Sequence, residues 1–337
     1  MSKLTAKQNI KAIVTAIKAE EQSLRARYPI LNQQNKIAMV ILLVSLCSLF
    51  GVATLYYLAI IPSWLCIILA AFITSISHEL EHDLIHKQYF SNRPFIHNFM
   101  MLTVWLMRPN TVNPWYRRKI HLHHHKVSGT SQDLEERLVG NGIKSPFLRA
   151  LVITDGLLGL LVNTKRFSKE ISGYKFLRVF NAGFPVATAY FAILYGVIAY
   201  YAVQFVQPFT LPPWGAELLA GAEFLMVVLI VPNIIRSTSL NLVTSSMHYY
   251  GGVNNLLEQT HVITSRCFLP FQLFCFDFGR THTIHHFVPN QPFYIRQLIS
   301  KKIRPIMAQH GVRFNDFQSL KHANHYPVKG QSSQQGV

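Results

Sequence analysis

Charged residues are scarce in this sequence, and acidic side chains are the scarcest of them. Only 14% of the 337 residues are charged, whereas a soluble globular domain carries about 25%. The 15 acidic residues face 32 lysines and arginines, which gives a formal net charge of +17. Such a charge attracts nucleic acid or anionic lipid headgroups. Because half of the residues are hydrophobic, we expect a membrane partner and no nucleic acid.

Cysteine is also rare, and its spacing excludes two common kinds of site. Cys47, Cys66, Cys267 and Cys275 form no C-x-x-C pair, so the sequence predicts neither a zinc knuckle nor a disulfide framework. Cys47 and Cys66 lie in apolar runs and are expected to be small core residues. A signal peptide is not expected either, because the first 36 residues are polar and basic.

Long runs without charge are, by contrast, abundant. Residues 37–61 contain no charged side chain, and about 20 apolar residues suffice for a helix to span a bilayer. Pro62 and Ser63 then interrupt the run before it resumes. We therefore predict an all-α integral membrane fold with four transmembrane helices in two hairpins, and Pro232 is expected to kink or end the last one. The predicted spans are residues 37–61, 62–86, 179–206 and 216–240.

The other residues divide into an arm, a cap and a tail. Residues 1–36 form a basic amphipathic arm in which apolar residues such as Ile13 and Ile17 have helical spacing, as in a helix that lies on a membrane surface or in one that is solvated. Residues 37–325 are expected to form one membrane domain with a helical cap. Residues 326–337 are polar and are expected to be a disordered tail.

The distribution of positive charge predicts the orientation of this multi-pass protein. Lysine and arginine occur in the arm, between the hairpins and near the C-terminus, whereas neither hairpin tip carries one. The positive-inside rule therefore places both termini and the whole cap on the cytoplasmic side.

Histidine is unusually frequent, and most of the 16 histidines fall into three clusters. The first cluster, in S-H-E-L-E-H-D-L-I-H, has a histidine at every fourth position. A step of four residues turns a helix by only about 40°, so these side chains share one face. The other two clusters, H-L-H-H-H and H-T-I-H-H, each contain the spacing H-x-x-H-H. The clusters contain His78, His82 and His86; His121, His124 and His125; and His282, His285 and His286.

Such clusters indicate bound metal. Neutral imidazole is a good ligand for iron, zinc and copper. Neighbouring imidazoles repel one another when protonated, and a bound cation reverses this because it takes the neutral form. All three clusters lie on the cytoplasmic side of the predicted spans, so separate segments can direct them at one volume. They offer too many ligands for one tetrahedral site, and we therefore expect two metal ions.

The motifs, over a four-span hydrophobic chain, resemble the membrane fatty acid desaturase and hydroxylase superfamily. The resemblance covers about residues 37–296. It rests on H-D-L-I-H followed by an aromatic residue and N-R, on H-L-H-H-H with D-L-E-E downstream, and on F-G-R-T-H-T-I-H-H-F-V-P. It implies a non-heme centre of two iron ions held by these histidines. The implied ligands are His82, His86, His121, His124, His125, His282, His285 and His286, with His248 as a further candidate.

Two further histidines and several carboxylates are candidates for the same site. His78 also fits the ligand set, because H-E-L-E-H matches the first motif as well as H-D-L-I-H does. His261 is expected to support the site rather than to bind metal. Carboxylates close in sequence are expected to accept the free N–H of ligating imidazoles and to fix their tautomers. These candidates are Glu79, Asp83, Asp133, Glu135 and Asp277.

The resemblance implies an enzyme that uses dioxygen and two electrons to oxidise a lipid hydrocarbon chain, with fatty acyl desaturation as the first choice. Hydroxylation of alkanes or fatty acids, carotenoid oxidation and decarboxylation to a terminal alkene remain open. The acyl tunnel is expected near residues 95–107 and the spans. Electrons are expected from a separate ferredoxin, rubredoxin or cytochrome. The basic cluster at Arg117, Arg118 and Lys119 suits either an acidic donor or lipid headgroups.

A membrane metal transporter or a bis-histidine heme protein is the alternative from another class. A transporter places its polar ligands inside the spans, near the bilayer midplane. The predicted spans carry almost no histidine outside the end of the second one. A heme protein is expected to show single, well-separated axial histidines rather than H-x-x-H-H.

Overall fold

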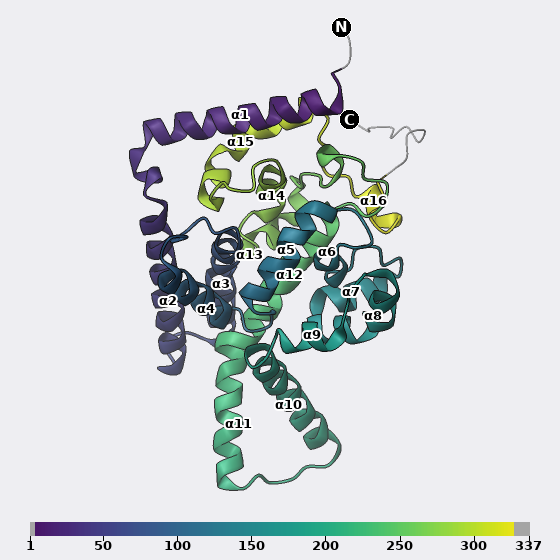
Figure 1. Cartoon of the computed structure of the whole chain (residues 1–337). Helices are drawn as coiled ribbons and strands as arrows, with labels where there is room; N and C mark the ends of the chain where they lie inside the picture. Colours follow the sequence, from purple (N-terminus) through teal and green to yellow (C-terminus); the bar gives the residue numbers. More distant parts are fainter. Residues whose placement is uncertain (1–3, 327–337) are drawn as a thin grey trace.

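The computed structural model describes residues 4–326, and its elements are helices joined by loops (Figure 1). Within this range there is no β-strand, only two isolated bridges that pair His248 with Thr260 and Val262 with Phe314. Four helical segments are long and apolar enough to cross a membrane. The predicted all-helical fold with four candidate spans is therefore confirmed.

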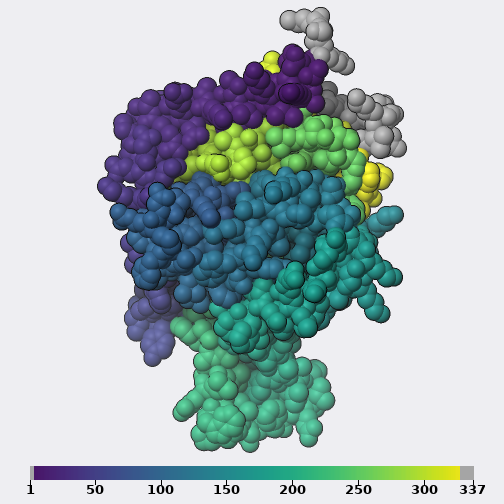
Figure 2. All heavy atoms as spheres, in the orientation of Figure 1, coloured from purple at the N-terminus to yellow at the C-terminus, as the bar shows by residue number. Residues whose placement is uncertain are grey.

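The four candidate spans come in two consecutive pairs. The first pair is α2 and α3, and the second is α10 followed by a long helix that passes through a π-helical turn. In the space-filling view the α10–α11 pair projects from the body of the molecule (Figure 2). The bounds are α2 Gln34–Tyr57, α3 Ser63–Ile85, α10 Val186–Val206, α11 Pro213–Leu225, the π-helical turn Met226–Ile230 and α12 Val231–Met247.

The last two spans differ in extent from the prediction. The third begins at Val186, because α9 (Phe176–Asn181) is a separate short helix before it. The fourth continues past Pro232 to Met247. A π-helical turn directly precedes this proline, and Val231 donates its N–H to the carbonyl of Met226. The wider turn lets the chain pass a residue that has no N–H to donate.

Helix α3 is the central element, and its two halves differ. Its first half is apolar and partly exposed, as suits a lipid-facing helix. Every residue from Ser77 to Ile85 is buried. Leu80 and Leu84 pack against Leu42 of α2 and Val104 of α4 in one apolar cluster. Apolar packing thus fixes the end of α3 that carries the first histidines inside the cap.

The cap surrounds this buried end of α3. Helices α4 to α9 lie between the hairpins in sequence, and α13 to α16 follow the second hairpin (Figure 1). Asn113 accepts a hydrogen bond from the N–H of Tyr116 and so caps the start of α5. The remaining helices are α1 Ala6–Arg27, α4 Pro94–Met107, α5 Pro114–Val127, α6 Leu134–Leu138, α7 Pro146–Thr154, α8 Gly156–Glu170, α13 Leu269–Phe274, α14 Phe278–Phe287, α15 Phe293–Gln309 and α16 Gln318–Lys321. Short 3-10 turns cover Pro29–Asn32, Leu256–Glu258 and Arg266–Phe268.

The N-terminal arm is helical, but its apolar face does not lie on a membrane. Helix α1 runs along α15 (Figure 1), and Ile13 and Ile17 are fully buried against Ile299 and Ile303. An amphipathic sequence can face lipid or protein, and here the protein covers it.

Tyr326, the first residue of the predicted tail, is ordered against the rest of the protein. Tyr326 donates its backbone N–H to the carbonyl of Gly251 over 2.9 Å, and the guanidinium of Arg313 lies 4.2 Å from its ring centroid. Residues 327–337 lie outside the described part of the chain.

Helix α1 is expected to contribute to stability through this packing. Ile17→Ala should lower the free energy of unfolding by about 2–5 kcal/mol, because it leaves a cavity in a filled core. Thr15→Ala, on the exposed face of the same helix, should change it by less than about 0.5 kcal/mol. Denaturant unfolding of the detergent-solubilised protein measures both, and equal small effects would mean that α1 is not docked.

Candidate metal centre

Four segments of the chain carry the clustered histidines into one buried volume. The end of α3 and the second half of α5 supply the first two clusters, and α14 supplies the third. His248, the residue that ends α12, supplies a further imidazole. Their ligand nitrogens form two separate groups, each compact enough to hold one metal ion.

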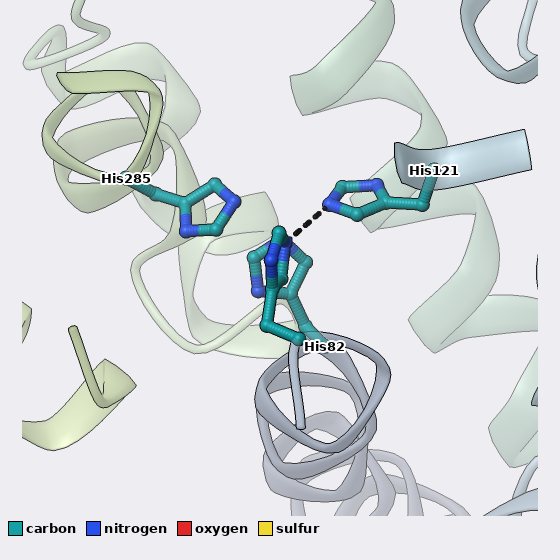
Figure 3. Close-up of side chains that lie close together, drawn as sticks. His82, His121 and His285 are labelled. Atoms are coloured by element: carbon teal, nitrogen blue, oxygen red, sulfur yellow. Dashed lines mark hydrogen bonds between the residues drawn. The ribbon is translucent and has the colours of Figure 1, made fainter. Parts of the chain in front are cut away.

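The first group contains His82, His86, His121 and His285, whose ligand nitrogens all lie within 4.8 Å of one another. Figure 3 shows that His82, His121 and His285 come from three separate helices and turn their rings toward a common volume. The Nε2 atoms of His86 and His121 are 2.9 Å apart. Residues some 200 positions apart in the sequence are thus neighbours here.

The second group contains His124, His248, His282 and His286, again with all ligand nitrogens within 4.8 Å. All four side chains are buried. Nε2 of His286 lies 3.2 Å from Nε2 of His248 and 3.2 Å from Nε2 of His282.

His125 lies between the two groups. Its Nε2 is 2.9 Å from Nε2 of His285 and 3.2 Å from Nε2 of His121, both in the first group. Its ring centroid is 5.2 Å from that of His286 in the second group. The two groups are therefore adjacent, and His125 can serve the first of them as a fifth ligand.

Hydrogen-bond acceptors fix the tautomers in the second group. Nδ1 of His248 lies 2.9 Å from the carbonyl oxygen of Thr244, and Nδ1 of His286 lies 2.9 Å from Oε1 of Gln259. These oxygens can only accept, so each Nδ1 carries the proton and each Nε2 carries a lone pair. Two lone pairs then face each other across 3.2 Å. This contact is repulsive unless a cation lies between them.

Carboxylates fix two further histidines in the same way. Nδ1 of His121 lies 2.7 Å from a carboxylate oxygen of Glu135, and Nδ1 of His124 lies 2.7 Å from one of Asp133. Such hydrogen bonds orient ligating imidazoles and make them more basic. Nε2 of each ring is left as the ligand atom.

His82 shows the same need for a ligand. Its side chain is 1% exposed, and within the described residues neither ring nitrogen has a hydrogen-bond partner. Buried polar atoms are satisfied in the great majority of cases. The donor set is all imidazole, which suits iron, zinc or copper rather than calcium or magnesium. The residues present therefore fit a pair of transition-metal ions.

Burial keeps most of these imidazoles in the neutral form that binds metal. Burial lowers the pKa of His86 to about 2 and that of His248 to about 3. His124 differs: burial lowers its pKa too, but the carboxylates of Asp133, Glu135 and Glu136 together outweigh burial and raise that pKa to about 10. A metal ion bound at His124 must displace that proton.

The structure places His78 and His261 outside both groups. Arg108 and Arg117 direct guanidinium N–H groups at Nδ1 of His78 over 2.7 and 3.4 Å, which occupies the lone pair of that atom. His261 donates from Nε2 to the carbonyl of Ser246 over 2.9 Å.

The carboxylates predicted to support the site fall into two sets, those that contact histidines and those that pair with arginines. Asp133 and Glu135 contact histidines, as described above. Glu79 and Asp83 are instead paired with Arg296 of α15, at 3.1 and 3.2 Å, although Asp83 also lies 3.8 Å from Nδ1 of His82. Asp277 pairs with Arg280 at 3.1 Å.

Sequence reasoning missed two residues that contact the site. Glu136 lies 3.3 Å from Nδ1 of His248, and Gln259 contacts His286. The acidic run after the second motif was a usable signal for Glu136. No sequence signal pointed to Gln259, because a loop brings it to α14 from 27 positions away.

The basic cluster on α5 does not present three charges to solvent. Arg117 forms ion pairs with Glu81 at 2.8 Å and Glu135 at 3.5 Å. Arg118 donates to the carbonyls of Leu84 and Ile85 over 2.9 and 3.0 Å. Both arginines therefore hold α5 against α3, and Lys119 is the exposed member of the cluster. Binding of an acidic donor or of lipid headgroups at this cluster stays a prediction.

A cavity of about 490 Å³ adjoins the candidate metal centre. A smaller hollow among the histidines shares its lining residues His78, Arg117 and Glu135. The rest of the cavity wall comes mainly from α8, α9, α10 and α12. Candidate spans α10 and α12 thus line the cavity, whereas none of residues 95–107 does. Helix α4 packs into the core on one side and exposes Phe95 on the other.

Fold and site together define a helical, membrane-type protein with two adjacent histidine groups, each of which could hold a metal ion. A sequence model described as "Fatty acid desaturase" matches residues 58–318, more than half of the chain. The chain therefore belongs to the fatty acid desaturase family and is a desaturase- or hydroxylase-like oxidoreductase. No curated protein matches it.

The carboxylates that contact histidines should matter for metal retention. Glu135→Gln is expected to lower metal affinity by about 10- to 100-fold, because the amide orients His121 but does not carry the charge that makes it basic. Asp277→Asn, which removes an equally plausible carboxylate by sequence, should leave affinity unchanged. Metal content after graded chelation measures both, and equal losses would contradict the assignment.

Proposed function

We propose that the protein is a membrane-bound, dioxygen-dependent oxidoreductase with a non-heme di-iron centre, and that it desaturates a fatty acyl chain. The observation that supports this most strongly is the set of Nε2 lone pairs that converge in a buried volume beside a largely apolar cavity. Membership in the fatty acid desaturase family supports the same reaction class.

The two histidine groups would each hold one iron, with His125 as a further ligand to the first. Bound iron supplies the activation of dioxygen and the removal of hydrogen from an unactivated C–H bond. The chain itself orients the ligands through Asp133 and Glu135. It also keeps bulk water from the centre, because the four histidines of the second group are buried.

The cavity would hold the hydrocarbon chain of the substrate. Its lining includes Leu157 and Leu160 of α8 and Phe191 and Ala192 of α10. A volume of about 490 Å³ lies in the range of ligand-binding pockets, about 300–1,000 Å³. Removal of two hydrogens gives a double bond, and the two electrons that complete the reaction would come from a separate ferredoxin, rubredoxin or cytochrome.

Iron binding at the second group is tested with His248→Ala. Removing this buried ligand should reduce the iron content from about two ions per chain to about one, and abolish product formation. His123→Ala, an exposed histidine on α5, should retain iron and activity. Elemental analysis and mass spectrometry of extracted lipids measure the two effects. One heme per chain, or unchanged iron in His248→Ala, would contradict the proposal.

The same lipid analysis decides between desaturation, hydroxylation and decarboxylation. A product two mass units lighter than the substrate, with a new double bond, supports the desaturase. An oxygenated product without new unsaturation would make the protein a hydroxylase, and a hydrocarbon one carbon shorter would make it a decarboxylase.

We also propose that both termini and the metal centre face the cytoplasm. A single cysteine at Thr210, in the loop between α10 and α11, should react with a membrane-impermeant maleimide in intact spheroplasts. A single cysteine at Thr5, just before α1, should react only after permeabilisation. The native cysteines are replaced by serine in both variants, and the reverse labelling pattern would overturn the orientation.

A further inference from the structure

The cavity beside the histidines has a strongly basic end. Three guanidinium groups, those of Arg108, Arg117 and Arg236, line it. Arg117 also lines the small hollow among the histidines, so the basic end is the end nearest the candidate metal centre. The opposite wall, on α8 and α10, is apolar. The cavity is therefore amphipathic along its length.

Arg236 has no acidic partner. Its side chain is 1% exposed, and its Nε and one Nη each donate to a neutral amide oxygen, at 3.0 Å from Asn233 and 3.0 Å from Asn110. Among the described residues no carboxylate lies within ion-pair distance of it. An unpaired buried charge is strongly unfavourable, so the charge of Arg236 requires an anion from elsewhere.

Its neighbours cannot provide that anion. Arg108 and Arg117 both pair with Glu81, and Glu135 is shared between Arg117 and His121. Three guanidinium groups thus face two carboxylates, which leaves one positive charge without a counter-ion.

We propose, building on the proposed function, that the substrate is a lipid with a free carboxylate and that this carboxylate binds Arg236. A monoanion completes the charge balance, whereas the ester of a neutral lipid does not. The carbonyl of a nucleotide thioester is likewise uncharged and would not balance Arg236. The hydrocarbon chain then runs along α10, and the carbons nearest the carboxylate lie nearest the histidines.

Binding rather than turnover tests this proposal. A saturated fatty acid with a fluorophore at its methyl end is bound to the purified protein in detergent, and unlabelled lipids compete for the site. Dodecanoic acid should compete at least about tenfold better than its methyl ester, since a hydrogen bond to a charged group is worth about 1.5–3 kcal/mol. The 2,2-dimethyl acid should compete poorly, because bulk beside the carboxylate meets the crowded end. Equal competition by acid and ester, or stronger competition by the acyl-CoA thioester, would overturn the proposal.

Variants separate recognition of the carboxylate from a structural role of Arg236. Arg236→Gln should weaken binding of the free acid at least about tenfold and leave binding of the methyl ester unchanged. Arg236→Lys should restore part of the preference for the acid. The control is Arg149→Gln. Arg149 also contacts α12, 2.8 Å from Oγ of Ser245, but it does not line the cavity. This change should alter the affinity for neither the acid nor the ester. Equal weakening of acid and ester in Arg236→Gln would mean that the residue only supports the fold.

The two proposals fail in different ways. Iron content and lipid products are measured on the same preparations. A protein that holds iron and oxidises lipid but does not prefer the free acid refutes only the role of Arg236. A protein that binds the free acid through Arg236 but holds no iron refutes only the di-iron oxidoreductase.

Discussion

The repulsion between facing imidazole lone pairs is the constraint on which the rest of the structure depends. His248 and His286 bring their Nε2 atoms to 3.2 Å, and each has its proton fixed on the other nitrogen by an acceptor oxygen. Such an arrangement is stable only around a cation. The carboxylates, the burial of α3 and the cap helices all hold these rings against one another, in the arrangement that the proposed metal ions would require.

Buried ion pairs tie the helices that carry these rings together. Arg117 of α5 and Arg296 of α15 both reach acidic residues on α3. Removing one partner of such a pair leaves an uncompensated charge in the interior, at a cost of about 3–5 kcal/mol. The three helices are therefore fixed in relative position more strictly than apolar packing alone requires, which is what a site with a tolerance of a few tenths of an ångström needs.

Periodic patterns in the sequence predicted what depends on local spacing. The spans and the shared faces of the histidine clusters follow from such patterns. Spacing could not separate His78 from His82, because both belong to the same four-residue repeat; the choice depends on Arg108, which reaches His78 from 30 positions away. Spacing also could not show whether the apolar face of α1 contacts lipid or α15, because an amphipathic helix can pack on either. Nor could it show that Arg117 and Arg118 turn inward, because a basic segment in the sequence can face solvent or pair with buried acceptors.

The scarcity of acidic residues has a consequence inside the protein as well as at its surface. Around the centre, Asp133, Glu135 and Glu136 contact histidines, while Glu79, Glu81 and Asp83 contact arginines. None is left for Arg236. An apolar side chain in place of a buried charge is often neutral or stabilising, so the fold alone does not explain a guanidinium at that position. A ligand that brings its own negative charge does, and the cavity in which it would lie leads to the histidines.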